Sequence, residues 1–538
     1  TLHGRARARV ASDGPLGDTA RTMRSSLLRS GLGLGLGCLL AACPTPNQGT
    51  ETSDAESGDC TPGTLNCVCA PDGCDLGLVC ASGLCVAGGD TTATAGTTGG
   101  PVTTASTGGD ATSTSGTTGD SATTSTPECQ GGPAASTDCP PERPFCDGAG
   151  TCVDCNGLAS CAAVDPAHPV CDAMSGACVQ CSADDASACG GNTPICDVAQ
   201  QTCMKCNAHE QCTSGACDLG TGACFPDDAV LWVDRAANPC GTGTQDSPFC
   251  EIQDAVETIA ANTPTVVKVK PGAMTYKTKI DVASGAVVAI LGDGGMPVVD
   301  VLADAALIND NARVYFSRLQ LGSSLTTAKG FLCVGGDVWT DRVDITARKS
   351  VAIDAIDCNI RLRRSRVYLN PGGGLKLSGG STRLENSFIT SNGTGFSTFA
   401  GVYLTNNAEL TAVYTTIIDN DAAMNADSLH CVNPGLVTIR NSVMFGQNAM
   451  TSVNCTGAEA TESVIDAMAI AGSGTQVVPT VQATWFKDPA NGDFHIKALA
   501  PFKDIAVWHA GDPAVDYDGE LRPSIDATPD YAGADRLP

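Results

Sequence analysis

Between residues 314 and 465 a short pattern returns every 21 to 28 residues. A small polar residue is followed two places later by an aliphatic one, and most copies carry another apolar residue three places before it. The polar members are Ser317, Asp341, Ser365, Ser387, Thr415, Ser442 and Ser463. Inward aliphatic side chains recurring once per turn of this length indicate coils of a parallel β-helix, in which each strand pairs with its equivalent one coil on. A β-sandwich would instead need hairpin signals between neighbouring strands. The sequence therefore predicts a mostly β fold, with a parallel β-helix domain over residues 225–538.

The cysteines of this segment follow the same period. Cys333 and Cys358 are 25 residues apart, and Cys431 and Cys455 are 24 residues apart, so each pair is separated by about one coil. Stacked coils lie about 4.8 Å apart, which is within the Cα separation that a disulfide spans. We therefore expect the disulfides Cys333–Cys358 and Cys431–Cys455, with Cys240–Cys250 closing a loop near the start of the domain.

Two further stretches carry a family resemblance. Residues 238–250 (NPCGTGTQDSPFC) and 267–272 (VKVKPG) resemble the start of right-handed parallel β-helix proteins of the pectate-lyase-like superfamily. Residues 514–523 (AVDYDGELRP) and 529–535 (PDYAGAD) resemble a tail common in secreted bacterial members of that superfamily. The resemblance implies a right-handed β-helix. It leaves the function open, because this fold carries lyases, hydrolases and non-catalytic surface proteins.

The N-terminal region has the layout of an export signal. Two arginines after Met23 precede an apolar run that is too short to span a membrane and that ends at Cys43. The sequence Leu-Ala-Ala-Cys at 40–43 resembles the lipobox of bacterial lipoproteins, which implies cleavage before Cys43 and a lipid on its sulfur. An ordinary signal peptide, cut nearby with Cys43 unmodified, is the alternative. We then expect residues 1–22 to be untranslated or an upstream extension, and residues 23–42 to be the signal peptide.

Cysteine usage and charge restrict the compartment and the partners. Without Cys38 of the signal and Cys43, 28 of the 30 cysteines remain, an even number that favours a disulfide framework in an exported protein. The net charge of −27 argues against nucleic acid as a partner, because binding phosphates requires clustered Lys and Arg. We therefore expect a protein of the cell envelope, in the outer membrane or at the cell surface, held to the membrane by the lipid on Cys43.

Four zones separate the anchor from the β-helix. Residues 43–59 form a polar tether, residues 60–85 a six-cysteine module, and residues 86–128 a Thr/Ser/Gly-rich linker that is open to O-glycosylation. Residues 129–224 contain four tandem repeats of four cysteines, each with a Cys-Asp pair at its third cysteine. Cys-x-x-Cys pairs at the repeat boundaries would suggest zinc in a cytosolic protein, but here we expect two disulfides per repeat and no metal. The connectivity stays open. The array resembles the Cys-rich repeats of myxobacterial surface proteins, which implies a spacer or recognition stalk.

The outward positions of the coils are rich in arginine. Arg318, Arg342 and Arg366 are expected in one slot of three successive coils, just after the repeated polar residue. Further arginines occupy the positions just before the slot. The candidate ligand-binding residues are Arg318, Arg342, Arg361, Arg363, Arg366 and Arg383. Either they form a groove for an acidic polysaccharide, with guanidinium groups on its carboxylates, or they form a solvated surface with local ion pairs.

Catalytic residues cannot be assigned from the sequence. The resemblance implies that a lyase on this fold would use an Arg or Lys base, usually with calcium held by aspartates. Asp-rich stretches begin at Asp419 and Asp516, but neither forms a complete calcium loop, and no stacked carboxylate pair suggests a hydrolase. His430 and His495 are expected to be structural. No cofactor is expected, apart from calcium if the protein is a lyase. The favoured hypothesis is a lipid-anchored surface protein that binds glycans or a neighbouring surface, and the alternative is a cell-anchored polysaccharide lyase or hydrolase.

Overall fold

The computed structural model describes residues 78–81, 84–87, 129–130, 138–140, 143–147, 149–157, 160–322, 328–394, 397–423, 425–447 and 452–537. The chain forms two units, residues 1–119 and 120–538. The expected signal peptide, Cys43, the tether and nearly all of the linker lie outside the described residues. Of the six-cysteine module, the structure describes the hairpin of β1 (Leu78–Ala81) and β2 (Leu84–Ala87), in which Cys80 lies opposite Cys85. No helix of the described residues is long and apolar enough to cross a membrane.

Each Cys-rich repeat contains one small antiparallel hairpin. The hairpins are β3 (Phe145–Cys146) with β4 (Cys152–Val153), β5 (Val170–Asp172) with β6 (Ala177–Val179), β7 (Ile195–Asp197) with β8 (Thr202–Met204), and β9 (Cys217–Asp218) with β10 (Ala223–Cys224). Short helical turns are η1 (Cys155–Gly157), α1 (Cys161–Val164) and η2 (His209–Gln211).

All four repeats share one disulfide connectivity, in which the first cysteine pairs with the third and the second with the fourth. The pairs are Cys129–Cys146, Cys139–Cys152, Cys155–Cys171, Cys161–Cys178, Cys181–Cys196, Cys189–Cys203, Cys206–Cys217 and Cys212–Cys224. The recurrent Asp after the third cysteine caps the hairpin turn. In the fourth repeat, for example, Asp218 Oδ1 accepts hydrogen bonds from the backbone N–H groups of Gly220 and Thr221 (3.0 and 3.1 Å). Such numerous disulfides are typical of an extracellular or secreted protein.

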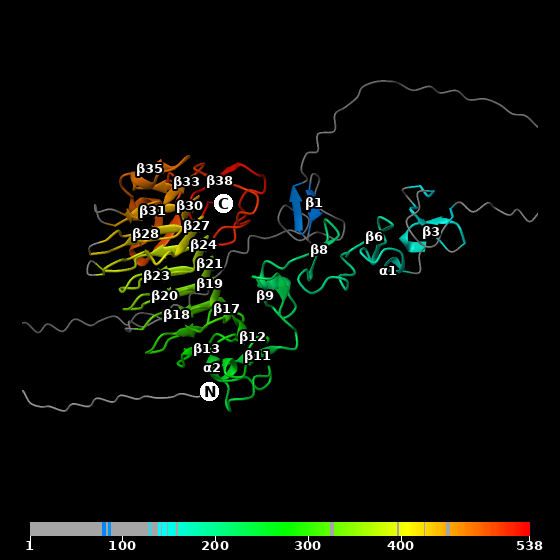
Figure 1. The fold of residues 1–538 in the computed structure, drawn as a ribbon, viewed down its shortest axis with the longest axis horizontal. Helices are drawn as coiled ribbons and strands as arrows, with labels where there is room; N and C mark the ends of the chain where they lie inside the picture. The colour runs from blue at the N-terminus through cyan, green and yellow to red at the C-terminus, as the bar shows by residue number, and fades with distance from the viewer. Residues whose placement is uncertain are drawn as a thin grey trace, which may run out of the picture. The chain divides into compact units, whose positions relative to one another are not determined.

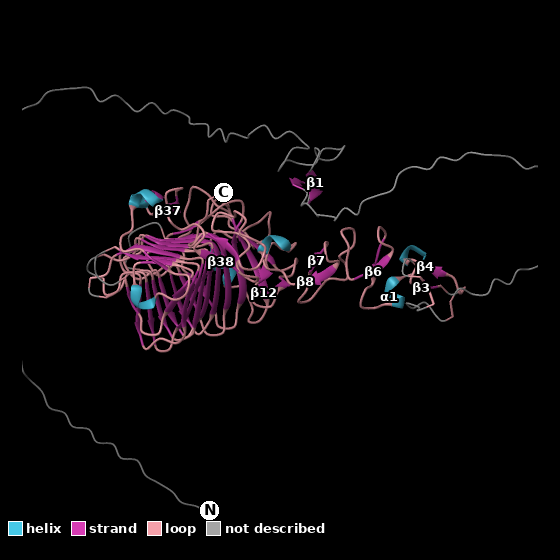
Figure 2. Ribbon diagram, turned by 90° about the horizontal axis from the view of Figure 1, so that it is seen from above, coloured by secondary structure: helices cyan, strands magenta, loops and turns pink. Residues whose placement is uncertain are grey.

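The C-terminal region is a parallel β-helix of about 8 turns, as the sequence predicts. Its strands stack from β11 to β35 in Figure 1, and Figure 2 shows the two sheets from above. The eight-stranded sheet consists of β13 (Ile280–Val282), β16 (Ala306–Ile308), β18 (Phe331–Val334), β20 (Ile353–Ile356), β23 (Leu375–Ser378), β26 (Val402–Thr405), β29 (Leu429–Val432) and β32 (Val453–Asn454).

The second sheet has 17 strands and bends along its length, so that each coil places two segments in it. It begins with β11 (Val230–Val233), β12 (Pro264–Val269), β14 (Val287–Gly292), β15 (Val298–Val299), β17 (Arg313–Leu321) and β19 (Asp337–Thr346). First segments after these are β21 (Asn359–Arg363), β24 (Ser381–Glu385), β27 (Glu409–Val413), β30 (Val437–Arg440) and β33 (Glu459–Thr461). Second segments are β22 (Arg366–Tyr368), β25 (Phe388–Thr390), β28 (Thr416–Asn420), β31 (Val443–Gly446), β34 (Val464–Ile465) and β35 (Gln476–Val477). Helix α2 (Ile252–Val256) packs against the first strands.

The bend between the two segments corrects one predicted alignment. Asp341 lies beside Arg363, 22 residues on, and not beside Ser365. The register follows the bend residue, which adopts a positive φ in Arg318, Arg342 and Arg364. Arg364 therefore occupies the slot that the sequence analysis gave to Arg366, and Arg366 lies beside Asp344 in the second segment. The alignment failed because Ser365 and Asp341 are both small and polar, although they stand on opposite sides of the bend.

Three disulfides lie in the β-helix, and they are the pairs that the cysteine spacing predicts. Cys333–Cys358 and Cys431–Cys455 join consecutive coils, with Cα atoms 6.3 and 4.7 Å apart. Cys240–Cys250 closes the loop after β11, with a Cα separation of 5.3 Å.

The C-terminal tail covers the second segments. It contains η3 (Met468–Ile470), η4 (Ala483–Trp485), β36 (Phe486–Asp488), η5 (Pro489–Asn491), β37 (Asp493–Ile496), β38 (Ala506–Trp508) and β39 (Thr528–Asp530). Its aromatic residues form a second core with Phe388, Tyr414 and Phe445. The buried Arg522 joins tail and coils, since its guanidinium pairs with Asp530 (2.9 Å) and lies 3.7 Å from the ring centre of Tyr414.

Candidate ligand-binding groove

The arginine-rich surface lies on the outer face of the first segments. Trp339, Arg361, Arg383 and Thr411 occupy equivalent positions in β19, β21, β24 and β27, so their side chains form one row across four coils. Alternate residues of a strand point to the same face, and the neighbours on either side in each strand are buried, among them the core residues Leu362 and Leu384.

Two arginines of this row share one buried carboxylate. Arg361 donates to Glu385 Oε2 through Nε (2.9 Å) and Nη2 (2.7 Å), and Arg383 donates to Oε1 through Nε (2.5 Å). The Glu385 side chain is 3% exposed, whereas those of both arginines are 37% exposed. Two guanidinium groups on one carboxylate leave a net positive charge, and it lies on the solvent side.

A second carboxylate is shared in the same way at the bend. Asp341 accepts hydrogen bonds from Arg363 Nε (3.0 Å) and from Arg364 Nε and Nη2 (2.8 and 2.7 Å). Burial opposes ionisation of Asp341, but the charges of Arg363 and Arg364 outweigh it and hold the pKa of the carboxyl below its usual value. With two guanidinium groups and one carboxylate, this cluster also has one positive charge in excess.

The remaining candidate arginines have different surroundings. Arg342 lies 3.4 Å from Glu210 of the fourth Cys-rich repeat. The Nε atom of Arg318 is buried and has no hydrogen-bond partner among the described residues. Arg366 forms a two-bond pair with Asp344 and lies 4.6 Å from the ring centre of Tyr368. Arg366 therefore belongs to the second segment and not to the arginine row.

A groove with a volume of about 470 Å³ follows the row. It is lined by Gly220, Thr221, Arg313, Asp337, Trp339, Asn359, Ile360, Arg361, Ser381, Thr382, Arg383, Glu409 and Thr411. A neighbouring side pocket of about 450 Å³ shares Arg361 with the groove and also includes Arg363 and Arg364. The side pocket lies between Asn207 and Ala208 of the fourth repeat and the tail loop 511–515. The groove and the side pocket together are thus lined by five arginines, Arg313, Arg361, Arg363, Arg364 and Arg383.

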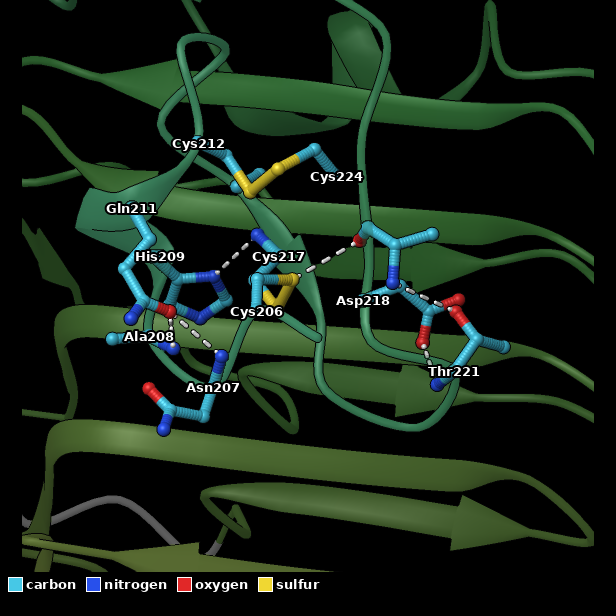
Figure 3. The surroundings of a disulfide bond; sticks show 12 residues. Cys206, Asn207, Ala208, His209, Gln211, Cys212, Cys217, Asp218, Thr221 and Cys224 are labelled. Carbon is cyan, nitrogen blue, oxygen red and sulfur yellow. Dashed lines mark hydrogen bonds between the residues drawn. A yellow bond between two sulfur atoms is a disulfide. The ribbon is translucent and has the colours of Figure 1, made fainter. Parts of the chain in front are cut away.

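The fourth repeat forms part of this site, which the sequence did not reveal. Its Asp218 accepts a hydrogen bond from the Tyr315 hydroxyl (2.5 Å) and another from Arg313 Nη1 (3.1 Å). His209 meets Tyr315 edge-on, with ring centres 6.2 Å apart, and Arg363 Nη1 donates to the Asn207 carbonyl (2.9 Å). Figure 3 shows this repeat in front of the strands, with its two disulfides and the hydrogen bond between His209 and the Cys217 N–H group.

Trp339 and Tyr315 are the functional candidates that the sequence reading missed. They occupy outward positions of two successive coils in a chain that is only 4% aromatic. The guanidinium of Arg361 lies 5.2 Å from the ring centre of Trp339. An aromatic residue at an outward position of a β-helix strand is the signal that could have identified this surface.

The carboxylates at this surface are of two kinds: Asp337 and Glu409 line the groove, whereas Glu385 and Asp341 hold its arginines. Glu385 and Asp341 each accept bonds from two arginines, so neither is placed to act as an acid or a base. Among the described residues, groups of three metal-ligand side chains occur only as disulfide cysteines and as His495, Asp518 and Asp535 of the tail, and neither kind lines the groove. The arrangement can hold negative charge against a flat ring.

Comparisons with known proteins give limited information. Residues 114–230 match the model of a family of unknown function (DUF8331), which covers the Cys-rich repeats but not the coils. No curated protein matches the chain. Among solved structures, pectate lyase Pel9A is 11% identical, with a TM-score of 0.34, and the match covers 57% of this chain and 96% of that one. A rhamnogalacturonan lyase is 14% identical, with a TM-score of 0.18 and coverage of 44% and 68%. At these values the two lyases say nothing about what the groove binds, and the function is argued from the groove alone.

Proposed function

We propose that the protein is an exported surface protein that binds an acidic polysaccharide in the groove and does not cleave it. In this proposal the lipid on Cys43 holds the chain in the outer membrane or at the cell surface, and the Cys-rich region carries the β-helix. The observation that carries the proposal is the pair of buried carboxylates, Glu385 and Asp341, that are each shared by two arginines.

The charge distribution supports an anionic ligand. The whole chain has a net charge of −27, yet four arginines of the groove and its side pocket surround the two carboxylates of Glu385 and Asp341. A fifth arginine, Arg313, also lines the groove, together with the carboxylates of Asp337 and Glu409. Guanidinium groups bind carboxylates through parallel hydrogen bonds, and they are already oriented here by Glu385 and Asp341. Pre-oriented side chains lose less entropy when a ligand binds.

The shape supports an extended ligand that includes sugar rings. The row of Trp339, Arg361 and Arg383 crosses successive coils, so equivalent side chains repeat about every 4.8 Å. Trp339 adds a flat apolar ring at one end of the row, beside the charged groups. A polymer with a carboxylate on each repeating unit would place two successive carboxylates beside Arg361 and Arg383.

Binding to a panel of acidic polysaccharides tests the proposal. The full chain is titrated with polygalacturonate, alginate and hyaluronate, with and without calcium, while unsaturated and reducing ends are followed. We expect binding that weakens as salt rises, without new ends. Turnover of any of these polymers would replace the proposal with the alternative of a cell-anchored lyase or hydrolase.

A matched pair of variants tests whether the ligand binds in the groove. Arg383→Gln leaves the pair of Arg361 with Glu385 in place, and we expect a loss of affinity of at least about tenfold, because a charge-assisted hydrogen bond is worth roughly 1.5–3 kcal/mol. Lys376→Gln makes the same charge change on the eight-stranded sheet and should leave the affinity unchanged. Equal effects of the two variants would show that binding depends on overall charge and not on this groove.

A further inference from the structure

The fourth Cys-rich repeat covers one end of the face that carries the arginine row. Val266, Ala289, Tyr315 and Trp339 are equivalent residues of four successive strands. The first three are completely buried. They pack in one cluster with Ala216 of the fourth repeat and with Phe225, the residue that follows the repeat.

The fourth repeat covers these equivalent residues as far as Trp339. A Cβ atom placed on Gly220 would lie 3.4 Å from the Tyr315 hydroxyl and 3.7 Å from the Trp339 ring, so the turn of the repeat lies directly on both aromatic residues. Beyond Trp339 the row becomes accessible at Arg361 and Arg383, and its last two equivalents, Thr438 of β30 and Glu459 of β33, are exposed. The groove is therefore blocked at the Trp339 end and open at the other end.

Disulfides and hydrogen bonds hold the turn that blocks the groove. The turn of residues 218–222 is closed by the hydrogen bonds to Asp218 and lies between Cys217 and Cys224, which both form disulfides. The same Asp218 binds Tyr315 and Arg313 of the β-helix. A ligand cannot pass Trp339 along the face without displacing an apolar cluster and these polar contacts.

We propose that the groove receives the end of an acidic polysaccharide chain, with the fourth repeat as the stop. The inference rests on the proposed function. A chain that follows the arginine row must run across the coils, and an internal stretch of polymer would have to continue through the space that Gly220 and Thr221 occupy. A chain end meets the stop without this conflict. The fourth repeat thereby determines which part of a polymer is recognised.

The stoichiometry of binding tests the inference. Size-fractionated polygalacturonate is used as the probe, and the number of protein molecules bound per chain is measured by analytical ultracentrifugation. The two ends of a polysaccharide differ chemically, so we expect one protein per chain at every length. A number that rises in proportion to chain length would overturn the inference and leave the proposed function intact. If polygalacturonate does not bind, the same measurement is made with whichever of alginate and hyaluronate binds. No binding of any of the three polymers would refute the proposed function and the inference with it.

A second measurement uses the stop itself. Thr221→Trp enlarges the turn toward the groove and should weaken binding of short oligogalacturonates at least about tenfold. Ser175→Trp makes a similar change at the corresponding turn position of the second repeat, three residues after Asp172, and should have no effect. Unchanged affinity in Thr221→Trp would overturn the role of the repeat as a stop. If this variant does not fold, the stoichiometry of the unaltered protein still decides the matter.

Discussion

Replacing Asp341 with Asn removes the negative charge from the carboxylate that pairs with Arg364, the bend residue between β21 and β22. The Asp341 side chain is 1% exposed and accepts three hydrogen bonds from Arg363 and Arg364. The Arg364 side chain is itself only 9% exposed, so water cannot replace the missing charge. Asp341→Asn therefore leaves a buried guanidinium without a counter-charge.

The size of the effect follows from these contacts. Removing one partner of a buried ion pair costs about 3–5 kcal/mol. The amide oxygen of Asn can still accept one of the bonds, which places the expected loss of unfolding free energy near the lower limit, at about 3 kcal/mol. The pKa of Asp341 is held below its usual value of 3.8. Its contribution is therefore complete above pH 3.8 and is lost as the pH falls through the folded-state pKa.

Urea unfolding of the full chain, followed by tryptophan fluorescence, measures the loss. Asp337→Asn is the matched control, since this carboxylate is 36% exposed and 3.8 Å from Arg313. An exposed pair of this kind is worth less than about 1 kcal/mol. If the two variants are equally stable, the shared carboxylate does not hold the bend, and the argument for pre-oriented arginines fails.

Three further predictions concern stability. Burial lowers the pKa of His209 from 6.5 to about 4, and its Nδ1 accepts a hydrogen bond from the Cys217 N–H group, so the stability of the fourth repeat should fall by roughly 3 kcal/mol at most as the pH drops from 6.5 to 4. Hydrogen exchange of the repeat should show this fall, and His209→Gln should abolish it. Replacing Cys333 and Cys358 together by Ser opens a link with a sequence separation of 25 and should cost about 3–4 kcal/mol, to be measured by urea unfolding under oxidising conditions. Asn392→Ala deprives two buried donors of Asn370 of their shared acceptor and should cost about 2–4 kcal/mol by the same assay. A loss below that of an exposed Asn→Ala change would refute a stabilising role for these two hydrogen bonds.

The recurrent pattern of the coils was sufficient to predict the parallel β-helix and its coil-to-coil cysteine pairs. These properties depend on contacts between equivalent residues of neighbouring coils, so the period of the repeat is enough to predict which side chains are in contact. The Cys-Asp pair of the repeats also recurred visibly, although its role as a turn cap for residues such as Gly220 needed the backbone. The lipid anchor on Cys43 remains a prediction from the sequence.

The groove could not be predicted from the repeat, because its contacts join segments that do not recur in the sequence. The register across Arg342 and Arg364 follows a backbone bend, which no residue type marks reliably, and the pairing of Arg361 with Glu385 depends on that register. The fourth repeat reaches Tyr315 from about a hundred residues away in the chain, at a sequence separation of 97. The sequence by itself determined the coil, because a β-helix is built from repeated local neighbours. Only the tertiary structure decided which arginines share a carboxylate and which module closes the groove, because both result from packing between segments that do not repeat.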